Sequence, residues 1–551
     1  MTSTTGDAAS RSSGARPDDP AASRVGRSAV SDWARVHWVG LVATTASLIV
    51  LLTNVHGIAL GDDGVGYRAI ADSLLGGRGL GYFLERPVTI WPPLWPALMA
   101  AVAWATPLTT TGAAIVLNAA TVGAAVLVGH RLLARLLQNE RLVVLGTLVI
   151  AFGSSTIGFG HLLMTDFAFA LVVMAWLLTL LNGRVSEQLW WPALAGVWVW
   201  VGFGLRYVAV ALIGIGGLWL LLDGSRPFLR RIGRAAIYGA VAIVVPVAWM
   251  LRNHSIDGTF TGERYPSARG LVDNAFDIVA TLGRFLLPGV ANGVDKIWAM
   301  VGLLGLLGAS VVVWKVLGAP TTVAGVDADA SAAASVSLRI RRAWNVLGRP
   351  AGLLLLTAGI YLAYMLYVRS TTALNQLDLR LLNPAYFPLM ALGLVVVDSA
   401  GTIDADGSTT WQRRSMTAAN LWAAANITAG LAGVVLFLSG NSFFAGNYSS
   451  DTFVAVRANP ALAALPANCR NYSNLPNALY PRVEAAWSPR RTGLESNAPV
   501  DDLRTIGQRL GQAPSCLIWI DQDPRYGHLW SLQKLSATYQ LELLARRGDV
   551  A

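Results

Sequence analysis

The sequence predicts a mainly α-helical protein that crosses a membrane many times and ends in a small α/β domain. Of its 551 residues, 54% are hydrophobic and only 13% are charged, whereas about 25% of the residues of a soluble domain are charged. Apolar runs of roughly 18 residues or more recur along the chain, and each is long enough to cross a hydrocarbon core of about 30 Å. Together these observations exclude a soluble globular protein.

The chain divides into three parts. Residues 1–36 are rich in Ser, Ala, Gly, Asp and Arg and have no apolar periodicity, which predicts a disordered cytoplasmic tail. Residues 37–438 form the transmembrane module, with about eleven spans. The runs at 189–205 and 206–222 join without a polar loop and are the least distinct pair. The expected spans are about 37–60, 110–133, 142–161, 166–182, 189–205, 206–222, 235–252, 297–317, 351–368, 382–399 and 418–438.

The distribution of arginine predicts the orientation. The net charge is +10, but the basic residues lie in short alternate loops and not in one patch, which argues against nucleic-acid binding. Loops rich in Arg stay in the cytoplasm, so we expect the N-terminus inside and, with an odd number of spans, the C-terminus outside. The bias of arginine over lysine is typical of GC-rich bacterial genomes, which places the chain in a bacterial cytoplasmic (inner) membrane. The arginines concerned are Arg24, Arg27, Arg35, Arg131, Arg135, Arg141, Arg226, Arg230, Arg231, Arg234, Arg339, Arg341, Arg342, Arg349, Arg413 and Arg414.

The last part, residues 439–551, has a lower apolar density. A β-like run at 516–520 and a helical pattern at 500–510 predict a small external α/β domain. The only two cysteines, Cys469 and Cys516, both lie in this part. A disulfide is compatible with an oxidising compartment, but the spacing alone leaves the pairing open.

The first external loop, residues 61–109, begins with two acids. Asp62 and Asp63 follow the first span directly, and Tyr67, Ile70 and Leu74 recur at helical spacing. We expect a helix along the membrane interface with a carboxylate pair at its N-terminal end. Two interpretations stay open: the acids cap the positive end of the helix, or they carry chemistry. A second interfacial segment, with aromatic residues at headgroup depth, is predicted at 91–96.

Three further charged residues lie at predicted membrane borders. Asp166 stands where one span leaves the membrane and the next enters, either as part of a helix cap or as a functional acid. Arg206 lies between two apolar runs, and Arg380 precedes a late span. Such arginines extend to the headgroups or bind phosphate through the guanidinium fork. Asp378, two residues before Arg380, is a simple ion-pair partner for it.

No cofactor or metal site is predicted. The six histidines are scattered, without an HExxH motif or paired spacing. A P-loop or Rossmann glycine pattern in the right context is missing as well, which argues against nucleotide binding. A divalent ion at Asp166 is left open, without support from the sequence.

These motifs, in this order, resemble the GT-C superfamily of membrane glycosyltransferases, in particular relatives of protein O-mannosyltransferases and aminoarabinose transferases. One of the similar features is an acid, Asp63, four residues before a tyrosine, Tyr67. The pair Asp62 and Asp63 departs from the Asp-Glu pair of the aminoarabinose branch, so that substrate is not assigned. The other similar segments are 71–74, 76–79, 92–96, 164–166, 205–207, Arg380 with 383–384, and 471–480, which is similar to the first strand of the external domain.

The resemblance implies a donor in which a sugar is linked to polyprenyl phosphate, and an extracytoplasmic acceptor in a cell-envelope glycan, lipid or protein. It implies an inverting single displacement with Asp63 as the base and Asp62 as its charged neighbour. Arg206, Arg380 and Tyr67 would bind the donor phosphate. For Asp166 the options are orienting the acceptor or holding a divalent ion. The alternatives are a membrane transporter, for which no internal repeat is visible, and a lipid-linked polysaccharide polymerase or scaffold.

Overall fold

The computed structural model describes residues 22–84, 86–288, 294–318, 347–400, 409–442, 446–500, 502–510, 514–521 and 527–550. Most of the predicted N-terminal tail, residues 1–21, therefore lies outside the described residues. The first helix, α1, runs from Ala22 to Thr53 and begins inside the stretch predicted to be disordered. Nucleation is the unfavourable step of helix formation, so a helix formed on the apolar run extends into the preceding residues at little cost.

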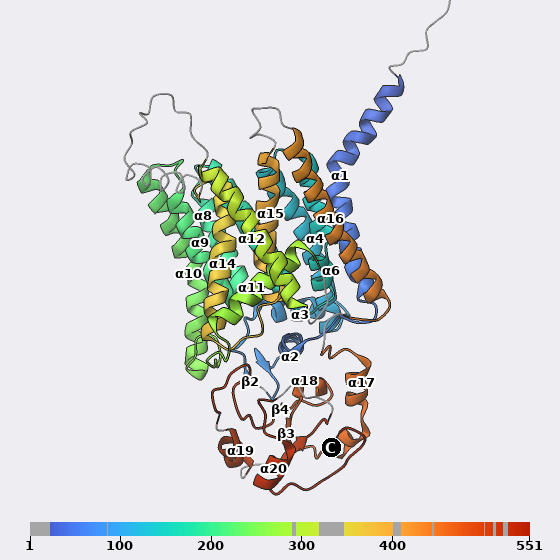
Figure 1. Ribbon diagram of the computed structural model, residues 1–551. Helices are drawn as coiled ribbons and strands as arrows, with labels where there is room; N and C mark the ends of the chain where they lie inside the picture. The colour runs from blue at the N-terminus through green and yellow to red at the C-terminus, as the bar shows by residue number, and fades with distance from the viewer. Residues whose placement is uncertain are drawn as a thin grey trace, which may run out of the picture.

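A bundle of apolar helices makes up most of the molecule (Figure 1). Among the described residues, seven helices are long and apolar enough to cross a membrane, and four shorter apolar helices accompany them. The protein is therefore a multi-pass membrane protein, while the count of eleven spans stays a prediction. The bundle contains α1, α4 (Thr110–Leu136), α5 (Glu140–Phe152), α6 (Ser154–Gly160), α7 (Asp166–Val185), α8 (Trp190–Leu205), α9 (Val210–Leu222), α10 (Phe228–Asp257), α11 (Leu271–Leu286), α12 (Asp295–Gly318), α14 (Pro350–Thr371), α15 (Leu379–Ala400) and α16 (Thr409–Leu438).

The uncertain pair of apolar runs forms two separate helices. Helix α8 ends at Leu205, and Arg206 adopts an extended backbone with φ −151° and ψ 131°. A short 3₁₀ turn, η1 (Tyr207–Ala209), then leads into α9. The break leaves Arg206 at the end of the bundle, where its side chain can reach other helix termini.

Short elements lie at one end of the bundle, between the helices and the C-terminal part of the chain (Figure 1). The predicted interfacial helix is α2 (Asp62–Leu75), with both acids in its first turn. It is followed by an antiparallel pair of two-residue strands, β1 (Gly81–Tyr82) and β2 (Arg86–Pro87). The second interfacial segment continues as helix α3 (Leu94–Ala105), which buries Trp95 and Met99.

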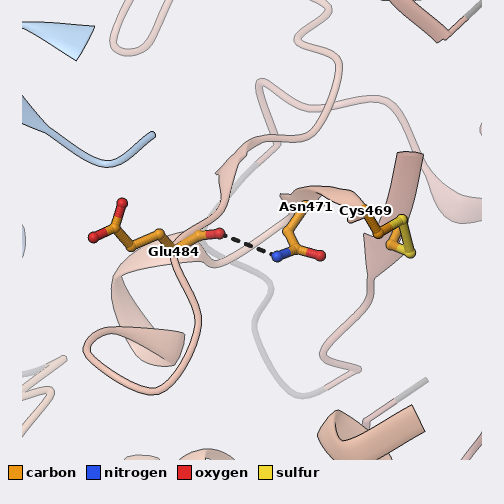
Figure 2. The surroundings of a disulfide bond; sticks show 4 residues. Cys469, Asn471 and Glu484 are labelled. Atoms are coloured by element: carbon orange, nitrogen blue, oxygen red, sulfur yellow. Dashed lines mark hydrogen bonds between the residues drawn. A yellow bond between two sulfur atoms is a disulfide. The ribbon is translucent and has the colours of Figure 1, made fainter. Parts of the chain in front are cut away.

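The C-terminal part contains a three-stranded parallel sheet in the order β4-β3-β5. Figure 2 shows the disulfide between Cys469 and Cys516 beside β3, and the Asn471 amide that donates to the Glu484 carbonyl at 3.4 Å. The Glu484 carboxylate points away from Asn471. The elements are α17 (Asp451–Ala458), η2 (Pro460–Ala464), β3 (Arg470–Ser473), α18 (Pro476–Leu479), β4 (Ala486–Trp487), α19 (Asp502–Leu510), β5 (Ser515–Ile518) and α20 (Leu532–Thr538).

Candidate active site

At the site, the loop between α1 and α2 contacts the loop between α6 and α7. The Ala59 N–H donates to the His161 carbonyl at 2.9 Å, and the Leu163 N–H donates to the Ala59 carbonyl at 3.0 Å. The first turn of α2 packs on the same loop, since a Cβ on Gly64 would lie only 2.8 Å from the Leu163 carbonyl oxygen. A side chain at Gly64 would therefore force the loops apart. The contact places the N-terminal ends of α2 and α7 side by side.

Asp63 faces Arg380. The Arg380 Nη1 lies 3.5 Å from the Asp63 Oδ2, and the two side chains are 17% and 34% exposed. The Trp91 Nε1 donates to the other carboxylate oxygen at 3.2 Å. Within the described part of the chain, the Arg380 Nε has no hydrogen-bond partner. Because tight charge-assisted pairs lie at about 2.7–2.9 Å, this one is loose enough for a ligand to separate.

Trp91 reaches Asp63 because a glycine leaves room for its ring. A Cβ on Gly66 would lie 2.7 Å from the Trp91 ring. The ring also makes edge contacts with Tyr67 and Tyr82, at centroid distances of 6.1 and 5.4 Å. We predicted Trp91 only as an interfacial aromatic and missed its bond to the acid. A glycine inside the first turns of a helix was the available signal, because it marks a close approach by another group.

Asp166 and Arg206 form a second ion pair. The Asp166 side chain is 1% exposed and that of Arg206 is 20% exposed. The Asp166 Oδ2 has no hydrogen-bond partner among the described residues. Asp166 is thus the buried counter-ion of Arg206, and this pair holds the start of α7 against the end of α8.

Tyr67 lies inside this arrangement. Its side chain is buried, and its hydroxyl lies 3.4 Å from the Thr165 Oγ1. Burial, followed by the negative charge of Asp63, raises the pKa of the Tyr67 phenol above its usual value. Tyr67 therefore keeps its proton at neutral pH and can donate a hydrogen bond.

The Asp62 carboxylate has different hydrogen-bond partners from those of Asp63. Its Oδ1 accepts hydrogen bonds from the Tyr448 hydroxyl at 2.7 Å and from the Asn477 Nδ2 at 2.6 Å. Both partners belong to the C-terminal part of the chain. Asp62 is therefore an anchor for that part, and the role beside Asp63 that we expected for it stays a prediction.

Two features near Arg380 differ from a simple reading of the sequence. The Asp378 Oδ1 accepts the backbone N–H groups of Arg380 and Leu381, at 3.0 and 3.1 Å. Asp378 thus caps the start of α15, where we expected an ion pair with the Arg380 side chain. A further cation, Arg264, lies beside the loop before Trp91: its Nη2 is 3.5 Å from the Ile90 carbonyl oxygen and donates to the Thr261 carbonyl at 2.9 Å. The sequence offered no motif that would have singled out Arg264.

The loop before Trp91 is held by the end of α10. Arg252 donates to the Val88 carbonyl at 2.6 Å, and the Asn253 amide donates to the Thr89 carbonyl at 3.3 Å. The Tyr207 hydroxyl donates to the same Thr89 carbonyl at 2.7 Å. In the Arg-Tyr motif the arginine therefore meets the buried acid of α7, while the tyrosine positions the loop that carries Trp91.

In the described part of the chain, no three His, Cys, Asp or Glu side chains come together as a metal site would require. These residues therefore offer no set of ligands for the divalent ion that the sequence left open at Asp166.

No protein-family model and no curated protein matches the sequence. The structure is similar to ArnT from Cupriavidus metallidurans in the apo state, with a TM-score of 0.58 and 13% identity over 94% of this chain and 97% of that chain. ArnT bound to undecaprenyl phosphate gives a TM-score of 0.53 and 14% identity over 93% and 97%. This is the GT-C fold. This confirms the predicted mainly α-helical, GT-C-like fold, while the count of eleven spans and the external α/β domain stay predictions.

A third similar structure comes from an archaeon. It is the oligosaccharyltransferase AglB from Archaeoglobus fulgidus, in complex with an inhibitory peptide and a dolichol-phosphate. The TM-score is 0.48 at 12% identity, over 89% of this chain and 70% of that chain. The fold of this chain rests on the two ArnT structures, and at 13% and 14% identity the activity has to be argued from the site.

Proposed function

We propose that the protein is a glycosyltransferase that moves a sugar from a polyprenyl-phosphate donor to a hydroxyl of an extracytoplasmic glycan, lipid or protein. The observation that carries the proposal is the Asp63 carboxylate facing the Arg380 guanidinium at the end of the helix bundle. A base and a phosphate-binding cation are the two groups that this reaction needs. The fold shared with a protein that binds undecaprenyl phosphate supports the donor class.

The chemistry is a single displacement. The acceptor oxygen forms a bond to the anomeric carbon while the bond from that carbon to the phosphate oxygen breaks. The acceptor proton passes to the Asp63 carboxylate, and the lipid phosphate leaves with its negative charge. Attack from the face opposite the leaving group inverts the anomeric centre.

The loose pair between Asp63 and Arg380 suits this sequence of events. When a donor phosphate binds Arg380, it competes with Asp63 for the guanidinium. The carboxylate is then released from its cation, just as the acceptor must transfer a proton to it. The indole of Trp91 keeps the carboxylate oriented through the other oxygen.

Arg206 and Tyr67 contribute in a different way. The charge of Arg206 is balanced by Asp166, so its attraction for a phosphate is weaker than that of Arg380. We therefore place Arg380 as the main donor-phosphate ligand, Arg206 as a positioning cation at the junction of α7 and α8, and Tyr67 as a neutral hydrogen-bond donor.

The C-terminal part supports a site outside the cytoplasm. It contacts the same end of the bundle as the site, through Asp62. Its disulfide joins Cys469 and Cys516, and disulfides persist in oxidising compartments. Together with the arginine-rich loops, this favours a cytoplasmic N-terminus and an external C-terminal part in a bacterial inner membrane.

The test is transfer of radiolabelled sugar from polyprenyl-phosphate mannose, arabinose or glucose in membranes that contain the protein. We expect transfer from one donor by the wild type and loss of it with Asp63→Asn. Asp273→Asn is the matched control, because Asp273 is an exposed acid in the first turn of α11. Full transfer by Asp63→Asn would contradict the proposed base, and no wild-type transfer from any of the three would favour a transporter or a polymerase.

A further inference from the structure

A separate cavity lies between α2 and the C-terminal part of the chain. Its volume is about 150 Å³. The turn after α1, the first turn of α4 and residues from the C-terminal part form its walls, and neither Asp63 nor Arg380 lines it. The cavity is therefore distinct from the candidate active site.

Two arginines line this cavity, Arg68 from α2 and Arg457 from α17. The Arg457 Nη1 donates to the backbone carbonyls of Tyr448 and Ala478, at 3.0 and 3.2 Å. These bonds fix the guanidinium without neutralising its charge. Burial, followed by the positive charge of Arg68, lowers the pKa of Arg457, as expected for two cations that face one space.

The carboxylate beside Arg68 is that of Asp72, and it already has other hydrogen-bond partners. Asp72 lies 3.7 Å from the Arg68 Nε, which is too far for a hydrogen bond. Its carboxylate accepts instead from the Thr110 hydroxyl at 2.5 Å and from the Tyr480 hydroxyl. Asp72 therefore offsets part of one positive charge, and the Asp62 carboxylate lies behind the Tyr448 hydroxyl. The charged side chains that line the cavity itself are the two arginines, which favours an anion there.

Two buried polar atoms at the cavity have no partner among the described residues. They are the Arg68 Nε and the Thr111 Oγ1. A buried donor without an acceptor is unfavourable by about 1–3 kcal/mol. Water can satisfy such groups, but the two guanidinium groups favour an anion that carries several acceptor oxygens.

We propose that this cavity is a second anion site that binds a phosphate group. Guanidinium groups match the oxygens of a phosphate in geometry and charge. The cavity lies where the apolar helix α1 ends and the apolar helix α4 begins, which is the expected membrane border. Leu52, Val55 and Leu108, close to these walls in the sequence, expose their apolar side chains. A lipid headgroup at this depth would bring its phosphate to the two arginines. The proposal does not depend on the transferase assignment.

The test uses the full chain with Arg380→Gln in every sample, so that the donor-phosphate site does not contribute. Inorganic phosphate is titrated into detergent-purified protein by calorimetry. In parallel, nanodiscs of phosphatidylcholine with or without phosphatidylglycerol are tested for lipid retained on the protein by native mass spectrometry. We expect Arg68→Gln with Arg457→Gln to weaken binding at least about tenfold, as loss of charge-assisted bonds predicts. Arg482→Gln, at an exposed arginine outside the cavity, is the matched control and should change nothing.

Thr111→Leu is the second variant. It removes the unpartnered hydroxyl and fills space without changing the charge, so it should weaken binding even where the double arginine variant fails to fold. Retained phosphatidylglycerol without a response to inorganic phosphate would identify a lipid headgroup. A response to both would identify any accessible phosphate, and either result supports the site. Undiminished binding in both variants, or no binding of either probe by the Arg380→Gln protein, would overturn the proposal.

Discussion

The Arg380 guanidinium lies 3.5 Å from the Asp63 carboxylate, although 317 positions separate the two residues in the chain. The contact joins the first turn of α2 to the first turn of α15. Trp91 holds the other oxygen of the same carboxylate. One carboxylate thus has a cation on one oxygen and a neutral donor on the other, an arrangement that orients it without neutralising it completely.

Replacing Arg380 by Gln should weaken use of the donor. A hydrogen bond to a charged group contributes about 1.5–3 kcal/mol, so kcat/KM for the donor should fall roughly 10- to 100-fold. Arg380→Lys should recover part of this loss, because lysine keeps the positive charge but lacks the planar guanidinium that binds two phosphate oxygens at once. Steady-state transfer at varied donor concentration measures the effect. An unchanged kcat/KM in Arg380→Gln would remove Arg380 from the donor site.

Breaking the pair between Asp166 and Arg206 should destabilise the protein. Arg206→Gln leaves the buried Asp166 without its counter-ion, which is unfavourable by roughly 3 kcal/mol for a buried pair. The double variant Asp166→Asn with Arg206→Gln should recover most of the lost stability. Thermal unfolding in detergent measures both proteins. Normal unfolding of Arg206→Gln together with complete loss of transfer would instead give Arg206 a direct catalytic part.

The spanning helices were predictable because the membrane restricts the choices. A segment in the bilayer must satisfy its own backbone hydrogen bonds, so a long apolar run can only become a helix or part of a closed barrel. The helical spacing of Tyr67, Ile70 and Leu74 likewise predicted α2. The amphipathic α11 was not predicted, since it lies between the expected spans 235–252 and 297–317 and is not part of a long apolar run.

The partners within the site were not predictable from local sequence. Nothing near Arg380 distinguishes an arginine that meets Asp63 from one that extends to the headgroups. The bonds of Asp62 to Tyr448 and Asn477 join residues 386 and 415 positions apart. Only the packing of the C-terminal part on α2 determines these contacts, so adjacent acids with different partners looked equivalent in the sequence.

Glu484 should hold the C-terminal part against the loop after α2. Its Oε2 accepts the Leu84 N–H at 2.8 Å. Leu84 has a left-handed backbone, with φ 57°, and packs against Tyr472 and Ile506 of the C-terminal core. Such a backbone is unfavourable by about 1–3 kcal/mol for a residue other than glycine, so the contacts must compensate for it. Glu484→Ala should therefore increase hydrogen exchange of β1 and β2.

The matched control for this prediction is Glu542→Ala, at an exposed acid of the same part of the chain. Faster exchange in both variants would indicate general loosening. Unchanged exchange of β1 and β2 in Glu484→Ala would show that other contacts hold the loop.

The disulfide between Cys469 and Cys516 should stabilise the C-terminal part. The two residues are 47 positions apart, and the chain-entropy description gives up to about 4 kcal/mol for a loop of that length. Cys469→Ser with Cys516→Ser should lower the temperature at which this part unfolds, as followed by limited proteolysis on heating. Alkylation of both thiols in the native protein without a reductant would contradict the disulfide.

The most direct measurement compares Asp63→Asn with Asp62→Asn, at saturating donor and with donor binding measured separately. Loss of a general base lowers kcat by about 10²–10⁴-fold. We predict a loss of this size for Asp63→Asn with donor binding retained. For Asp62→Asn we predict a change of less than about tenfold, since its Oδ1 bonds to the C-terminal part and not to the groups around Asp63. Turnover by Asp63→Asn at the wild-type rate, or a greater loss in Asp62→Asn, would contradict the account.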